Sequence, residues 1–143
     1  MGYYTQFQFT AHLSEKPEHA ALLDWLEAKK YQDDVPFDDH SFFQCPRWTA
    51  VFLGGGAVYQ YWRPPVFERK ARTPFVAYNS LQLTSTFKNY GSEIDEFLDW
   101  IRPFTAWWPG DPTFVGYSLG EEDERPKLHF IGPEGVRTEY GRA

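Results

Sequence analysis

A nine-residue stretch near the beginning of the chain decides the fold: Thr5-Gln6-Phe7-Gln8-Phe9-Thr10-Ala11-His12-Leu13. Apolar and polar side chains alternate along it, which is the period of a strand with one buried face. The same alternation returns at residues 81–88, Leu-Gln-Leu-Thr-Ser-Thr-Phe-Lys. These two stretches predict strands of one sheet, with the apolar side chains under helices. The opposite face would then carry the polar set: Gln8, Thr10, Thr84 and Thr86.

Each of these strands is followed by a segment with helical spacing. Residues 17–30 predict an amphipathic helix, because Leu22, Trp25 and Leu26 fall on one face and Pro17 is tolerated in a first turn. In the second half, apolar residues recur at i, i+3, i+4 and i+7: Ile94, Phe97, Leu98 and Ile101. Ser92 followed by Asp95 resembles a capping box, and Pro103 ends the helix.

Short β-prone runs complete each half. Residues 48–53 and 58–62 flank Gly54-Gly55-Gly56, which predicts a hairpin. Residues 113–119 and 127–131 predict a second pair of strands, and residues 136–140 a short edge strand. Pro64-Pro65 is expected to end the strand before it.

The order of elements therefore predicts an α+β fold made of two strand–helix–strand–strand halves. The halves would span residues 3–63 and 80–140 of a single domain, 1–143, with residues 64–79 as a connecting loop. Both helices would cover one face of an antiparallel sheet. Trp25 and Trp100 would occupy equivalent places in the two halves.

Composition excludes several classes of protein. A net charge of −6, from 14 basic and 20 acidic side chains, argues against direct nucleic-acid binding. A single cysteine, Cys45, cannot form an intrachain disulfide, and the first residues lack the pattern of a secretory signal. No apolar run reaches the length of a membrane helix. We therefore expect a cytoplasmic protein that contacts no membrane.

Candidate chemistry is sparse, and we expect no catalytic residue, metal site or cofactor. The carboxylates at Asp33, Asp34, Asp38 and Asp39 beside His40 lack the spacing of a calcium loop and read as a solvated acidic loop. His40 and Cys45 are five residues apart, a weak signal for a nucleophile and its base. The acidic run Glu121–Glu124 reads as a soluble hairpin loop that could also meet a basic partner.

Aromatic residues are unusually frequent, with 13 Phe, 9 Tyr and 6 Trp making up 20% of the chain. For any one ring, a place in the core is the simpler interpretation. A surplus of rings also favours a binding surface, where Trp and Tyr are enriched. The candidates lie on a predicted strand and beside a Pro-Gly turn: Tyr59, Tyr61, Trp62, Trp107 and Trp108.

Two resemblances add context. The opening Met1-Gly2-Tyr3-Tyr4-Thr5 resembles the start of a group of small phage and prophage proteins of unknown function. That resemblance implies an accessory protein acting in a host cytoplasm. The doubled strand–helix–strand–strand order resembles the GyrI-like drug-binding domains, which pair two such units around a groove. It is an analogy of fold, and it assigns no binding residue here.

The leading hypothesis is a non-enzymatic binding module that uses an aromatic-rich surface for a host protein or a small molecule. The surface would lie on the sheet face away from the helices or between the halves. One alternative is a small hydrolase using Asp or Glu with His. Another is a structural or self-assembling protein, and a homodimer is possible in either case.

Overall fold

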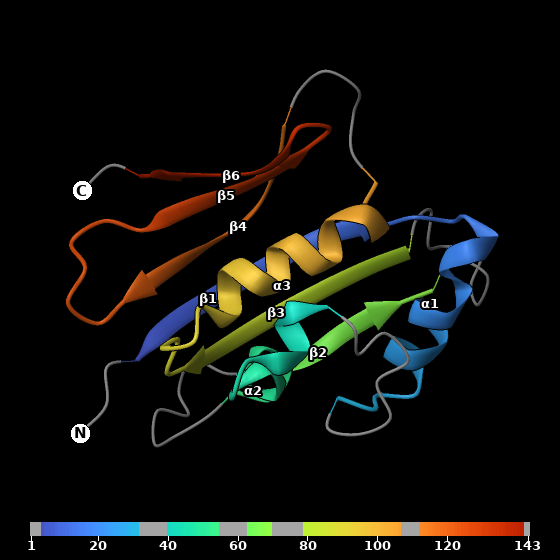
Figure 1. Cartoon of the computed structure of the whole chain (residues 1–143), viewed down its shortest axis with the longest axis horizontal. Helices are drawn as coiled ribbons and strands as arrows, with labels where there is room; N and C mark the ends of the chain where they lie inside the picture. Colours follow the sequence, from blue (N-terminus) through green and yellow to red (C-terminus); the bar gives the residue numbers. More distant parts are fainter. Residues whose placement is uncertain (1–3, 32–39, 55–62, 70–78, 107–111, 142–143) are drawn as a thin grey trace.

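The computed structural model describes residues 4–31, 40–54, 63–69, 79–106 and 112–141. Its strands are β1 (Thr5–Leu13), β2 (Arg63–Glu68), β3 (Asn79–Phe87), β4 (Thr113–Gly120), β5 (Lys127–Gly132) and β6 (Gly135–Tyr140). They form one six-stranded sheet in the order β2-β3-β1-β4-β5-β6 (Figure 1). Every neighbouring pair is antiparallel.

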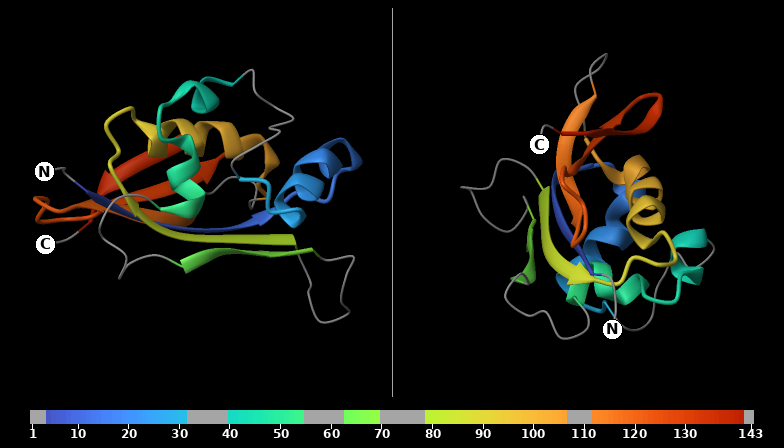
Figure 2. Two further views of the ribbon diagram at one scale, coloured as in Figure 1. Left: turned by 90° about the horizontal axis from the view of Figure 1, so that it is seen from below. Right: turned by 90° about the vertical axis from the view of Figure 1, so that its left-hand side faces the viewer.

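Helices cover only one face of this sheet (Figure 2). They are α1 (Ala20–Glu27), α2 (Trp48–Leu53) and α3 (Glu93–Ile101), with short 3-10 turns η1 (Pro17–His19), η2 (Ser41–Gln44) and η4 (Arg102–Phe104). The predicted α+β class, the antiparallel sheet and the single helical layer are therefore confirmed. None of the described helices has the length and apolar character that crossing a membrane requires.

The central pair, β1 and β3, follows the predicted alternation. Thr5 lies opposite Phe87 and Leu13 opposite Asn79, so the two strands pair over their whole length. Phe7, Phe9, Leu81 and Leu83 are fully buried under the helices. On the other face Thr84 donates a hydrogen bond to Gln8 across the pair, at 2.9 Å. This face of the sheet carries none of the described helices (Figure 2).

The core is built largely from rings. Phe97 of α3 is fully buried, and its ring meets the rings of Phe7 and Phe9 edge-on at centroid distances of 5.8 and 5.1 Å. It also contacts Phe42 and Phe52, which come from η2 and α2. Edge-to-face pairs of this kind add to the free energy gained from burial alone. Among the described residues, much of the aromatic surplus therefore lies in the core.

The order of four of the described strands has an internal two-fold pattern. In the order β2-β3-β1-β4, β1 and β3 lie in the middle and β2 and β4 lie outside them. Exchanging β1 with β3 and β2 with β4 gives the same order read from the other end. Trp25 of α1 and Trp100 of α3 are both buried and meet edge-on at 6.4 Å. β5 and β6 then extend the sheet on one side only (Figure 1).

Three local predictions are wrong. Residues 48–53, predicted as a strand, form helix α2, and Gly54 ends this helix with a positive φ of 70° rather than opening a hairpin. Residues 64–68, predicted as part of the connecting loop, belong to β2. Ser92 makes no capping hydrogen bond through its side chain; Asn89 accepts the Ile94 N–H instead, at 3.0 Å.

Candidate functional site

A groove opens in the sheet where β1 and β4 separate. Their pairing runs from Thr5 opposite Gly120 to Phe9 opposite Gly116. Beyond that rung, within the part of the chain that the structure describes, Thr10 and Ala11 have no partner residue in β4. The segment after α3 lies along the end of β1 instead, with the Ala106 N–H donating to the His12 carbonyl at 2.9 Å. The space between has a volume of about 410 Å³.

Gly116 determines where the groove begins. A Cβ at this position would lie 1.8 Å from the backbone oxygen of Gln8, so β1 and β4 approach closely only because residue 116 has no side chain. Next to it, the register between β4 and β5 shifts between Phe114 and Gly116. A β-bulge of this kind bends the strand and redirects side chains. The close rung and the bulge together account for the divergence of β4 from β1.

The groove is lined by rings, hydroxyls and small apolar groups. Its described lining residues are Gln8, Thr10, Ala11, His12, Thr105, Ala106, Thr113, Phe114, Val115, Gly116, Tyr117 and Ile131. None of these is an aspartate, glutamate, lysine or arginine. Phe114 is 52% exposed and packs edge-on against Phe130 at 5.6 Å, which leaves a large apolar surface at the rim. Such a lining can hold an aromatic ring and offer it neutral hydrogen-bonding groups.

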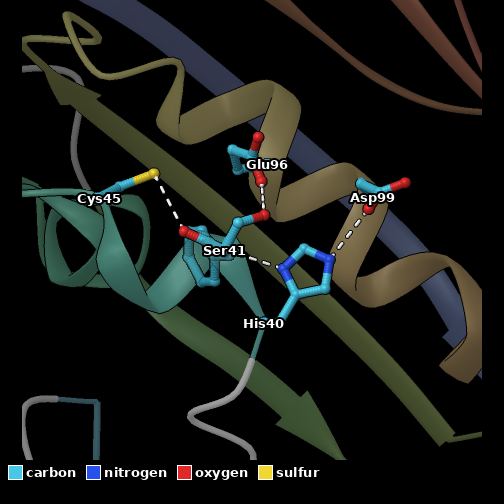
Figure 3. A network of polar contacts seen from close by, with 6 residues as sticks. His40, Ser41, Cys45, Glu96 and Asp99 are labelled. Carbon is cyan, nitrogen blue, oxygen red and sulfur yellow. Dashed lines mark hydrogen bonds and ion pairs between the residues drawn. The ribbon is translucent and has the colours of Figure 1, made fainter.

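A second cluster of polar groups joins η2 to α3 (Figure 3). His40 Nδ1 accepts the Phe42 backbone N–H at 2.9 Å, so in the neutral ring Nε2 carries the proton and donates it to Asp99 at 2.9 Å. Ser41 donates its hydroxyl hydrogen to Glu96. Both ring nitrogens of His40 are therefore engaged, and the imidazole cannot take a proton from a neighbouring nucleophile.

Cys45 is not activated in this cluster. Its Sγ lies 3.4 Å from the Gly91 carbonyl oxygen and 3.7 Å from the Ser41 carbonyl oxygen, and the thiol can donate its hydrogen to either. Burial, followed by the charges of Glu93 and Glu96, raises the pKa of Cys45 above its ordinary value. A thiol held protonated in this way is a poor nucleophile. His40 and Cys45, the weak candidate pair in the sequence, have other hydrogen-bond partners and do not bond to each other. The cluster connects η2 to α3.

Buried His129 forms a hydrogen-bonded chain with two hydroxyls. Its Nε2 lies 2.9 Å from Ser118 Oγ and its Nδ1 3.0 Å from Thr138 Oγ1, so it joins β4, β5 and β6. His129 is 1% exposed and Ser118 is 6% exposed. A substrate could not reach a serine and a histidine buried to this extent. This hydrogen-bonded chain is therefore a structural link between the three strands. Its testable chemical property is the proton binding of His129.

We expect His129 to make folding stability depend on pH. Burial, followed by the charge of Lys127, lowers the pKa of His129 from 6.5 to about 4. Between these values the unfolded chain binds a proton that the folded chain does not. The stabilisation is therefore complete above about pH 6.5 and decreases by about 3 kcal/mol as the pH falls to 4. Urea unfolding at several pH values should show a shallower dependence for His129→Gln, and identical curves for the two proteins would contradict this assignment.

The structure does not describe the site residues that the sequence predicts. Tyr59, Tyr61, Trp62, Trp107 and Trp108 are outside the described residues, so their predicted role stays a prediction. Asp33–Asp39 also lie outside them. In the described ranges, no group of three His, Cys, Asp or Glu side chains could hold a metal ion. In the acidic turn, Glu121 accepts the Tyr4 N–H at 2.6 Å and Asp123 the Gly120 N–H at 2.9 Å, as a hairpin loop requires.

The sequence interpretation did not select the groove residues on β4. In the sequence, Phe114, Gly116 and Tyr117 are part of the predicted strand 113–119. A signal was available, because a glycine inside a strand often marks a bulge or a close approach of two backbones.

Comparison of the chain with protein-family models, with curated proteins and with solved structures finds no match.

Proposed function

We propose that this protein is a non-enzymatic binding module whose site is the groove between β1 and β4. Its ligand would be a small, uncharged and largely apolar aromatic molecule. The observation that carries the proposal is the end of the pairing between β1 and β4 after Phe9. It leaves a groove with a volume of about 410 Å³ beside the exposed ring of Phe114. Pockets for small molecules have volumes of roughly 300–1,000 Å³ and combine apolar walls with a few polar groups.

The charge of the lining supports an uncharged ligand. A phosphate or carboxylate would need Lys or Arg nearby, and a cation would need a carboxylate, because burying an unpaired charge is costly. The described lining offers instead neutral donors and acceptors, such as Thr10, Thr105 and Gln8. An aromatic ring could pack against Phe114 at the rim while its polar substituents reach these groups.

The two histidine clusters favour binding over hydrolysis. His40 has both nitrogens engaged, and the pair formed by Ser118 and His129 is buried. Neither cluster is among the described residues that line the groove. The opening Met1–Thr5 still suggests a phage-type accessory protein acting in a host cytoplasm, and this part of the proposal rests on those five residues alone.

Titration with Nile red, an uncharged aromatic dye, tests the proposal by fluorescence. Phe114→Ala removes the exposed ring and should weaken binding about 2- to 12-fold, as expected for the loss of one aromatic contact. Thr10→Glu places a carboxylate in a groove whose described lining has none and should weaken binding further. Val66→Ala is the matched control, because Val66 is 46% exposed on β2 and is not among the lining residues. Equal affinity in all four proteins would refute the groove as the site.

A further inference from the structure

Strand β6 forms one edge of the sheet (Figure 1). It pairs with β5 on one side, from Gly132 opposite Gly135 to Lys127 opposite Tyr140. On its other side, no strand among the described residues pairs with it. Val136 is 36% and Tyr140 60% exposed, and the residues between them are exposed as well. An edge strand with this exposure is a template for pairing with another strand.

The backbone direction along β6 can be assigned from its last contact. The Gly141 N–H donates to the Pro126 carbonyl at 2.8 Å, toward the β5 side. In an antiparallel ladder these directions alternate from one residue to the next. Residues 135, 137 and 139 therefore point their backbone groups at β5. The N–H and C=O groups of Val136, Thr138 and Tyr140 point away from it, along the outer edge.

We propose that β6 pairs antiparallel with β6 of a second copy of this chain, about a two-fold axis that passes midway between the two Thr138 residues. In that register Thr138 lies opposite Thr138, and Arg137 lies opposite Glu139 in both directions. Val136 lies opposite Tyr140. The residues whose backbone groups point outward meet as the hydrogen-bonded pairs. The sequence of β6 is thus complementary to itself under the symmetry of a two-fold dimer.

The charges on β6 support this partner. Many proteins place charged side chains on edge strands to prevent pairing. Here the two charges are opposite in sign and flank Thr138 symmetrically, so a second copy would meet attraction. They would form non-hydrogen-bonded pairs, in which facing side chains are closest. Within one chain, Arg137 Nε lies 3.7 Å from Glu139 Oε2 with both side chains more than half exposed, a contact easily exchanged for one across the axis.

Because a single pair of short strands buries little surface, the dimer should be weak and dependent on concentration. Sedimentation velocity from about 10 µM to about 1 mM should show an increasing fraction of dimer in the wild type. Arg137→Glu alone, or Glu139→Arg alone, gives two pairs of like charges in the dimer, one on each side of the two-fold axis. Each should weaken dimerisation about fourfold or more.

Two combinations make the test specific. The double variant Arg137→Glu/Glu139→Arg restores opposite charges across the axis and should dimerise like the wild type. An equimolar mixture of the two single variants should form a heterodimer, since one chain then carries two carboxylates and the other two guanidinium groups. Thermal unfolding should change little in all of them, because both side chains are exposed and the contact of the Arg137 guanidinium with the Phe130 ring, at 4.7 Å, is a weak one at the surface. A monomeric wild type, a dimer insensitive to single reversal, or a mixture without heterodimer would each overturn the proposal. The groove proposal does not depend on this result.

Discussion

We expect Phe97→Ala to lower the free energy of unfolding by about 3–5 kcal/mol, the usual cost of emptying a large aromatic position in a core. Phe97 is fully buried and contacts rings from β1, η2 and α2. Its removal therefore takes away the side chain at which the helical layer and the sheet meet. Close packing around the cavity limits how far the neighbours can relax to fill it.

Urea unfolding with linear extrapolation measures this change. Phe114→Ala is the matched control, because it removes the same side chain from a position that is 52% exposed. It should cost much less than the change at Phe97. A loss of less than about 1 kcal/mol for Phe97→Ala would show that this face of α3 is not the centre of the core.

We expect Gly116→Ala to destabilise the protein by about 2–6 kcal/mol, as the sum of backbone strain and overpacking. Gly116 has a φ of 152°, and an added Cβ would lie 1.8 Å from the Gln8 oxygen and 3.0 Å from Phe9 Cα. These atoms belong to the backbone of β1, so no side-chain rotation relieves the clash. The last rung between β1 and β4 would have to open.

Gly135→Ala separates the two causes. Gly135 also has a positive φ, 128°, but an added Cβ would meet nothing within 4 Å. It should therefore show only the strain, about 1–3 kcal/mol. Thermal and urea unfolding of both variants measure the difference. Equal losses at the two positions would mean that the close approach at Gly116 contributes nothing to stability.

Much of the fold could be predicted because two strands carry a strict alternation. In β1 and β3, a shift of one residue would expose Phe7, Phe9, Leu81 and Leu83, so the sequence permits only one assignment of faces. The helical spacing of Ile94, Phe97 and Ile101 is equally restrictive, and all three are buried.

A short apolar run does not distinguish a buried strand from a buried helix. Residues 48–53 are an apolar run, and such runs fit a buried strand and a buried helix equally well. The helix buries Ala50, Val51 and Phe52 in succession. Pro64 and Pro65 are expected to end a strand, but they lie within β2, at an edge of the sheet. The pairing of β2 with β3 is irregular between Arg63 and Val66, so neither proline has a partner residue in β3, and both are tolerated.

The groove was harder to predict than the elements around it. It depends on β4 lying beside β1 and on their separation beyond the pair formed by Phe9 and Gly116, and neither follows from the local sequence. Gly116 was visible as a glycine within a strand, but its contact with the Gln8 oxygen requires the register between two strands far apart in the chain. Chain topology, more than local propensity, makes this site.

The most direct test of the proposed function is to map a ligand on the protein by NMR. Indole, a small uncharged aromatic molecule, would be titrated into ¹⁵N-labelled protein while the backbone amide shifts are followed. The groove proposal predicts saturable shifts centred on Thr10, Thr105 and Phe114. In Phe114→Ala they should need about 2- to 12-fold more indole to reach half-saturation, and in Val66→Ala the midpoint should be unchanged. Shifts centred on another surface, or no saturable shift at any residue of β1 and β4, would contradict it.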